Sequence, residues 1–435
     1  MRLKTWAASL AVALTLPFLH GCGNDDAQKG EVRVVNATIE YPSLDLYTQD
    51  STGSDDLVVS GTAAGTASGY AGVDRGTYTF VVKSTGAAAN AATVSGTVTK
   101  TDHFSIVTYL TGGKASATFL TDDEDNPASG NAKLRVFNAA TGEAASVDVY
   151  LSTNACNALT VTDTAFASAV TGLQTSYSQI TASGSGSTWN VCVFAAGDTS
   201  TLLLDIPALT LKNQEIATLI LTHTSGGVLL NGAVLDQQGA MTAYTSQISR
   251  VRVAADATNS QQVSVTLAGT DLTSLATSPS VNDYETIVSG SSLTGTVTVN
   301  GTATPITALT LAAGTDYTLL VTGDAGAPVV TLIADNNTPS TSTTSTVKAR
   351  VINGVNGLTG SLSATIDNKS LGNATLGAAS TYVQIPATTG TSTVQASIVT
   401  NPTSLVNQSF TASGVYTVFI WGDASAPKLA ITQDR

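Results

Sequence analysis

A short phrase recurs four times in this chain and indicates how it is divided into domains. The phrase occupies residues 32–37, 134–139, 250–255 and 349–354, and in each copy an arginine stands among apolar residues: Arg33, Arg135, Arg252 and Arg350. The copies follow one another at intervals of about 100 residues, which is the size of one β-sandwich and far longer than a solenoid repeat. The sequence therefore predicts four sandwich-sized domains in series.

Each copy of the phrase is followed by a segment in which apolar and polar residues alternate: 44–47, 147–151, 263–267 and 362–366. A period of two is typical of a half-buried strand. The last two units end in similar hairpins, at 317–333 and 416–431. We expect about seven strands per unit. The predicted fold class is all-β, with four tandem immunoglobulin-like β-sandwich domains after a lipoprotein signal peptide.

The predicted boundaries follow the polar stretches between the units. We expect a signal peptide at 1–21, a lipid-anchored tether at 22–30, and sandwiches at 31–121, 132–236, 248–335 and 347–435. The linker at 335–346 is almost entirely Thr, Ser, Asn and Pro, so we expect it to be extended and mobile. Four such domains arranged in a line would reach roughly 140 Å from the membrane.

The first residues have the features of a targeting segment. Arg2 and Lys4 form a positive region, and residues 6–19 are mostly apolar. This run is too short to span a bilayer as a helix, but it has the length of the apolar region of a signal peptide.

Residues 19–22, Leu-His-Gly-Cys, resemble a bacterial lipobox, although His20 departs from the usual small residue. We therefore predict that Cys22 is lipidated; the alternative is an ordinary secretory signal followed by an unrelated cysteine. Several acyl chains would form a stable anchor in the membrane. Residue 23 is Gly, not the Asp that retains lipoproteins of Gram-negative bacteria in the inner membrane. The resemblance implies an outer-membrane lipoprotein, at the periplasmic face or the cell surface.

The charge and the cysteines limit the possible partners and the compartment. The formal net charge is −13, with 31 acidic and 18 basic side chains, and such a chain is repelled by nucleic acid. The expected partners are the membrane, through the anchor, and an unknown protein or glycan. If Cys22 carries lipid, Cys156 and Cys192 form an even pair in an oxidising compartment, and we predict that they form a disulfide.

The sequence contains no metal-binding His/Cys motif, no nucleophile elbow, no Walker loop and no dinucleotide fingerprint. We therefore predict that the protein is not an enzyme and has no cofactor. One dense acidic run lies in the first linker: Asp122, Asp123, Glu124 and Asp125. It is either a solvated linker face or a weak candidate for a Ca²⁺ site that stiffens the joint.

Two further features have alternative interpretations. The recurring arginine is either a solvated strand residue, one partner of a cross-strand ion pair such as Arg33 with Asp45, or part of a ligand-binding ladder. Trp421 precedes the last hairpin loop. It is either a core aromatic or an exposed tip residue that contacts glycan or protein.

The opening phrase V-R-V-x-N-A, followed by a V-D-V-Y strand, resembles a family of uncharacterised bacterial lipoprotein repeats, a domain of unknown function. The match is close at 32–47 and 134–150 and partial in the other two units. The resemblance implies immunoglobulin-like sandwiches on exported proteins and brings no catalytic residues. We expect a non-enzymatic lipid-anchored envelope protein, serving as a spacer, adhesion or assembly module; the alternative is a carbohydrate- or polymer-binding surface lipoprotein.

Overall fold

The computed structural model describes residues 28–49, 52–111, 114–142, 144–160, 162–172, 174–224, 226–339, 345–397 and 403–435. The predicted signal peptide and Cys22 lie outside these residues. Within them, no helix is both long and apolar enough to cross a membrane.

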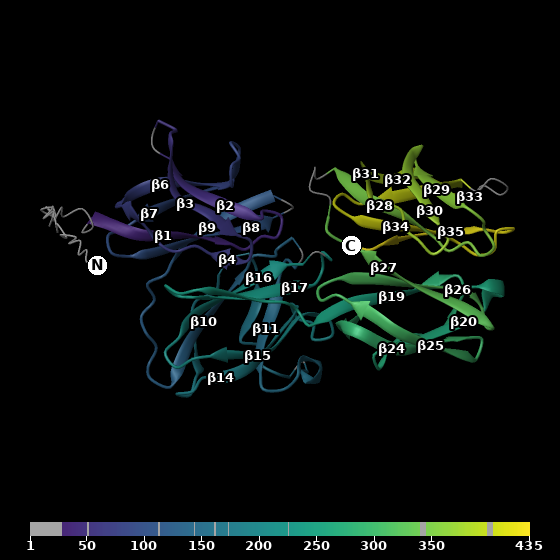
Figure 1. Ribbon diagram of the computed structural model, residues 1–435, viewed down its shortest axis with the longest axis horizontal. Coiled ribbons are helices and arrows are strands. Elements are labelled where there is room, and N and C mark those ends of the chain that lie inside the picture. The colour runs from purple at the N-terminus through teal and green to yellow at the C-terminus, as the bar shows by residue number, and fades with distance from the viewer. Residues whose placement is uncertain are drawn as a thin grey trace, which may run out of the picture.

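Four sandwiches follow one another along the chain, and we call them domains 1 to 4 (Figure 1). Domain 1 contains β1 (Lys29–Asn36), β2 (Ser43–Gln49), β3 (Asp55–Ala63), β4 (Thr66–Ala67), β5 (Ala71–Asp74), β6 (Gly76–Ser84), β7 (Asn90–Val98), β8 (His103–Thr111) and β9 (Lys114–Thr121).

Domain 2 adds a short 3₁₀ helix to the same plan. It contains β10 (Asn131–Asn138), β11 (Val147–Ser152), η2 (Cys156–Ala158), β12 (Ala167–Val170), β13 (Ser178–Thr181), β14 (Ser187–Ala195), β15 (Leu202–Leu211), β16 (Ile216–His223), β17 (Leu230–Asp236) and β18 (Met241–Tyr244).

Domains 3 and 4 complete the series. Domain 3 contains β19 (Ile248–Ala257), η3 (Thr258–Ser260), β20 (Gln262–Leu267), β21 (Thr270–Thr277), β22 (Ser280–Val281), β23 (Glu285–Val288), β24 (Gly290–Val299), β25 (Thr302–Leu311), β26 (Asp316–Asp324) and β27 (Ala327–Asp335). Domain 4 contains β28 (Thr346–Asn353), β29 (Ser361–Ile366), β30 (Lys369–Thr375), β31 (Val383–Pro386), β32 (Thr388–Ser397), β33 (Thr403–Phe410), β34 (Val415–Trp421) and β35 (Lys428–Gln433).

The all-β prediction is confirmed, and the domains share one topology. In each, the first strand carries the recurring phrase and pairs in parallel with a later strand of the same sheet, which we call its parallel partner: β1 with β8, β10 with β16, β19 with β26 and β28 with β34. The other four-stranded sheet is antiparallel, in the order β3-β2-β6-β7 in domain 1. Each sandwich has its own apolar core. The described part of a domain holds eight or nine strands, more than the predicted seven, because short strands extend the first sheet.

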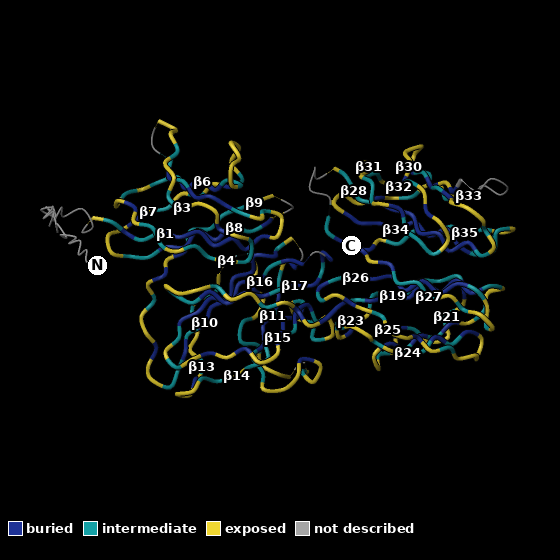
Figure 2. The backbone as a smooth tube through the Cα atoms, viewed as in Figure 1, coloured by how far each residue is buried: buried dark blue, intermediate teal, exposed yellow. Residues whose placement is uncertain are grey.

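The first strand of each domain and its parallel partner are buried on both faces. In β1 every residue from Val32 to Asn36 is buried, and β34 is buried along its whole length. Figure 2 shows these strands as continuous dark segments inside the molecule. Val32 and Val34 face the core of domain 1, whereas Arg33 and Val35 face away from it. Because that second face is also buried, another domain must cover it.

The domains pack in pairs, so the predicted line of four is wrong. Domain 1 packs on domain 2 and domain 3 on domain 4, and the two pairs lie side by side (Figure 1). We call the two contacts the N-terminal junction and the C-terminal junction. The first sheet of each domain carries apolar residues beside its arginine, and burying them against the partner's first sheet stabilises the pair.

A turn of domain 2 joins the two pairs. The Asn337 N–H donates to the carbonyl of Gly226 at 2.8 Å, and the Arg435 guanidinium donates to the carbonyl of Gly227. A Cβ on Gly226 would lie 2.5 Å from the carbonyl oxygen of Gly314, and one on Gly227 would lie 2.2 Å from the backbone nitrogen of Thr338. These glycines allow the close approach of the two backbones.

Two of the expected linkers contribute to the packing. The second contains β18, which pairs with β17 and extends domain 2 beyond residue 236. The third begins with Asp335 and Asn337, which are buried, so the prediction of an extended, mobile segment is wrong there.

In the last two domains, Tyr317 and Tyr416 accept hydrogen bonds from backbone N–H groups five residues upstream, as in a tyrosine corner.

Candidate functional site

The junctions contain a polar cluster that recurs in the four domains. Each arginine of the opening phrase lies beside a hydroxyl of the parallel partner of its strand and under the ring of a tyrosine. The tyrosine shortly precedes a short strand that pairs with the first strand. The sets are Arg33, Ser105 and Tyr70; Arg135, Thr218 and Tyr177; Arg252, Thr318 and Tyr284; Arg350, Thr417 and Tyr382.

The geometry within these sets is nearly constant. Each arginine Nε donates to its Ser or Thr hydroxyl, at 2.7 to 3.3 Å. The Arg Cζ atoms lie 4.5 to 4.8 Å from the tyrosine ring centroids, which is within the range of a cation–π contact. Parallel pairing sets this geometry, because register places each arginine directly opposite its hydroxyl.

In the C-terminal junction each arginine reaches an acid of the other domain. Arg252 donates to Asp434 Oδ1 at 2.6 Å, and Arg350 donates to Asp335 Oδ1. Each acid lies two residues after the residue that pairs with the hydroxyl residue, Ile333 opposite Thr318 and Thr432 opposite Thr417, and both acids are buried. Two cations therefore face two anions, and the charges of this cluster balance.

The N-terminal junction has one acid for its two arginines in the described part of the chain. Asp122 Oδ2 accepts from Arg33 at 3.2 Å, while Asp122 Oδ1 lies 3.7 Å from Arg135 Nη2. Gln237 occupies the position in domain 2 that an acid occupies in the other three domains. Arg33 bonds instead to the carbonyls of Asp236 and Gly239 in domain 2. Arg135 Nη2 is buried without a hydrogen-bond partner among the described residues.

Apolar residues surround both polar clusters. In the N-terminal junction, Val35 and Phe137 belong to one apolar cluster that spans domains 1 and 2. In the C-terminal junction, Phe419 and Trp421 stack with ring centroids 5.0 Å apart, in a cluster that also includes Ala254 of domain 3. Trp421 is 3% exposed, so the core interpretation is correct and the alternative of an exposed tip residue is wrong. The first sheet of domain 3 covers it.

The interpretation of Arg33 as a cross-strand ion-pair partner of Asp45 is also wrong, because β1 and β2 belong to different sheets. Asp45 instead accepts the N–H of Gly61, an edge-strand residue with positive φ. Asp148 and Ser264 do the same for Ala169 and Leu275. These side chains satisfy backbone donors at β-bulges that the ladder leaves unpaired. The solvated-strand interpretation of the arginines is wrong as well, since all four are buried.

The acidic run of the first linker is distributed over several partners. Asp122 lies in the N-terminal junction, Asp123 contacts His103, and Glu124 pairs with Lys133. Asp125 contributes its carbonyl, which accepts from Lys133. In the described part of the chain, no group of three or more His, Cys or acidic side chains is arranged to hold a metal ion.

Burial controls the protonation of the junction groups. Burial raises the pKa of all four cluster tyrosines, so they are neutral phenols. Burial by itself lowers the pKa of Arg252, but the charges of Asp434 and its neighbours outweigh this and hold the pKa above its usual value. Such groups stay fixed in one charge state at neutral pH.

One buried carboxyl behaves differently. Asp256 accepts the Gly422 N–H at 2.8 Å through Oδ1, whereas Oδ2 has no hydrogen-bond partner among the described residues. Burial raises the pKa of Asp256 to about 8.

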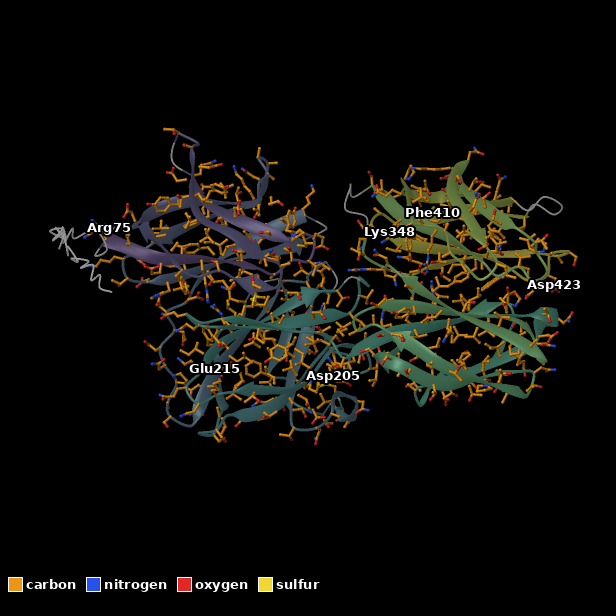
Figure 3. The ribbon with its side chains drawn as sticks, in the orientation of Figure 1. Arg75, Asp205, Glu215, Lys348, Phe410 and Asp423 are labelled. Carbon is orange, nitrogen blue, oxygen red and sulfur yellow. A yellow bond between two sulfur atoms is a disulfide. The ribbon has the colours of Figure 1, made fainter. Side chains whose placement is uncertain are left out.

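Figure 3 shows Lys348 and Asp423 toward opposite ends of the C-terminal junction. Asp423 adds to the rise in the pKa of Asp256, and burial lowers the pKa of Lys348 to about 8.

The predicted disulfide is present. Cys156 of η2 and Cys192 of β14 are joined with an S–S distance of 2.02 Å, inside domain 2 and away from both polar clusters. The sequence singled out the recurring arginines but did not predict that they lie buried between two domains. The available signal was the residue two positions after each arginine: Val35, Phe137, Ala254 and Ile352. These residues lie on the same face of the strand as the arginine and are apolar, which indicates that this face is buried and not exposed to solvent.

Comparison with protein families confirms the resemblance for part of the chain. The family described as Domain of unknown function (DUF4397) matches residues 30–150. The matched segment covers nearly all of domain 1, all of β10 and most of β11, and therefore includes Arg33, Asp122 and Arg135 of the N-terminal junction. No curated protein matches the chain.

Among solved structures, the chain is similar to two putative cell adhesion proteins, from Bacteroides uniformis and Bacteroides ovatus. The identities are 13% and 12%, over 48% of this chain in both cases and 99% and 98% of theirs, with TM-scores of 0.21 and 0.20. The Bacillus anthracis TIE protein is 9% identical over 87% of this chain and 67% of its own, with a TM-score of 0.16.

Proposed function

We propose that this chain is a non-enzymatic, lipid-anchored envelope protein whose four domains form one rigid scaffold for adhesion or assembly. The observation that carries the proposal is the pair of junctions. The four arginines of the repeated phrase, Arg33, Arg135, Arg252 and Arg350, are buried between domains. Each half is therefore a two-sandwich block, and a flexible spacer would not need such contacts.

Two features support an exported location. Cys22 follows an apolar segment in a lipobox-like sequence, and the chain carries a disulfide between Cys156 and Cys192. A disulfide is typical of an oxidising compartment such as the periplasm or the cell surface. The anchor would be Cys22, and the absence of Asp at position 23 favours the outer membrane. The partner would be a protein or glycan of the envelope. The carbohydrate-binding alternative loses its one named residue, since Trp421 is buried.

Small-angle X-ray scattering, recorded on the monomer fraction that gel filtration separates from the chain from Gly23 onward, tests the scaffold. This chain contains every described strand. We expect a compact particle whose scattering fits the paired arrangement with no change between low and high salt. A particle as long as four domains in line, or a mixture of shapes, would overturn the proposal.

A second experiment tests the anchor and the location. Labelling with radioactive palmitate in cells should mark the wild-type chain and leave Cys22→Ala unlabelled and released from membranes. Proteinase treatment of intact cells then distinguishes the surface from the periplasm. Labelling of the Cys22→Ala chain would contradict lipidation at this residue, without bearing on the scaffold.

A further inference from the structure

The second sheet of each domain is the one without the recurring phrase, and one of its edge strands differs from all the others. The strand orders are β3-β2-β6-β7, β12-β11-β14-β15, β21-β20-β24-β25 and β30-β29-β32-β33. Two edges per domain make eight strands in the described chain, and seven contain a residue with positive φ that interrupts the ladder. These residues are Gly61 in β3, Ala169 in β12, Ala208 in β15, Leu275 in β21, Ala308 in β25, Gly372 in β30 and Asn407 in β33. The eighth strand, β7, has none.

The interruptions are of the kind that prevents a sheet edge from pairing with another strand. A bulge twists the edge away, and a proline removes a donor from it. Every one of the seven strands has a register shift in its pairing. In addition, Pro207 lies in β15 and Pro305 in β25.

By contrast, β7 pairs regularly along most of its length. Residues 92 to 98 match residues 82 to 76 of β6 without a break, and the single shift lies at the start of the strand. The strand contains no proline and no charged residue. It lies at the outer side of domain 1, away from domains 3 and 4 (Figure 1). A regular, uncharged edge is a template for one more strand.

The side chains of β7 fit a second copy of the same strand. Thr93, Ser95 and Thr97 are exposed and alternate with Ala92 and Val98, which are buried. In antiparallel pairing about Ser95, Thr93 of one copy faces Thr97 of the other, so hydroxyls meet hydroxyls on the outer face. Facing Thr residues stabilise such a pair, and β7 already has one with β6: the Thr77 and Thr97 hydroxyl oxygens are 2.9 Å apart.

The charge of the chain also favours this edge for self-association. With a net charge of −13, most surfaces of two copies repel each other. A strand without charge avoids the local part of that repulsion. We propose that β7 is the dimerisation edge of this protein, pairing antiparallel with β7 of a second copy to form one continuous eight-stranded sheet with two-fold symmetry.

Matched charge variants test this pairing in the chain from Gly23 onward, by sedimentation velocity over a range of concentrations. The wild type should dimerise. Thr93→Lys with Thr97→Lys should weaken dimerisation about tenfold or more, because like charges then face each other at two places. Thr93→Glu with Thr97→Glu should do the same. An equimolar mixture of the two variants should recover the dimer.

The control is Thr307→Lys with Thr310→Lys on β25, where both residues are exposed on an interrupted edge. This variant should dimerise like the wild type, and every variant should still melt in one cooperative transition, which shows that it folds. A wild type that stays monomeric at all concentrations overturns the proposal. A dimer whose stability is unchanged by the charged residues on β7 also overturns it, because the contact would then lie elsewhere on the surface.

Discussion

The two junctions are built from the same parts but balance their charges differently. In the C-terminal junction, Arg252 and Arg350 each take an acid from the opposite domain, Asp434 and Asp335. In the N-terminal junction, Asp122 lies between both arginines. The N-terminal junction therefore buries one more cation than anion, whereas the C-terminal junction does not. An unpaired buried charge costs several kcal/mol, so the N-terminal junction is the less stable of the two in this respect.

The difference follows from one position. Gln237 provides no charge for Arg33, so Arg33 takes the near oxygen of Asp122, and Arg135 is left 3.7 Å from the other oxygen. Gln237 instead bonds the backbone of Glu124 in both directions, at 2.9 and 2.8 Å. One substitution in a repeat thus changes the pairing of both arginines across the contact.

The apolar parts differ as well. Ala37 and Ala139, four residues after their arginines, both lie in the apolar cluster of the N-terminal junction. The corresponding residues of the C-terminal junction are Asp256 and Gly354. The glycine leaves the space that the Asp256 carboxyl occupies, since a Cβ there would lie 2.5 Å from Asp256 Oδ2.

The largest expected effect comes from the single acid of the N-terminal junction. Asp122→Asn leaves Arg33 and Arg135 buried without an anion, so we expect a loss of about 3–5 kcal/mol in the stability of this domain pair. Hydrogen exchange of β1 and β10 amides measures it. Asp434→Asn is the matched control and should cost less, because Asp335 stays beside Arg252 and Arg350. Equal losses would show that the two junctions do not differ in this way.

The second prediction concerns the space beside Asp256. Gly354→Ala should cost about 1–3 kcal/mol, because the new methyl group overlaps the carboxylate and the packed sheets cannot move apart freely. Adding Asp256→Ala should restore most of the loss by recreating an alanine pair. Urea unfolding of the single and double variants measures the coupling. Additive losses would contradict a direct clash.

The third prediction is a pH dependence that belongs to the C-terminal junction. Since the pKa of Asp256 is raised to about 8, the folded protein binds its proton more tightly than the unfolded chain. The contribution of this group is complete below about pH 4 and is lost as the pH rises toward 8, by at most about 1.4 kcal/mol per unit. Melting temperatures of Asp256→Asn should therefore fall less across this range than those of the wild type. Parallel curves would rule out the effect.

The smallest expected effect is a gain. Gln237→Asp supplies the acid that domain 2 lacks, so Arg33 can pair with domain 2 and leave Asp122 to Arg135. The gain of a charged hydrogen bond exceeds the loss of the two bonds to Glu124 by about 1 kcal/mol. Thermal melting should rise accordingly, whereas Gln237→Ala should lower it. A loss with Gln237→Asp would mean that the bonds to Glu124 matter more than the charge.

Much of the fold could be predicted from the sequence. The repeated phrase and the alternating segments indicate four all-β units, because strand periodicity and repeat length are local properties. The disulfide pairing followed from the count of cysteines. The site could not be predicted in the same way. An arginine on an alternating strand is usually solvated, and nothing local says that a second sheet covers it.

The sequence by itself therefore determined what each domain is: an alternating β-sandwich with a valine-rich first strand and an arginine on its outer face. Only the tertiary structure decided what the arginine and Trp421 do, because their burial depends on which sheets meet. That choice is made by surfaces about 100 residues apart in the chain. The free energy of covering them is a property of the pair of domains, not of either strand alone.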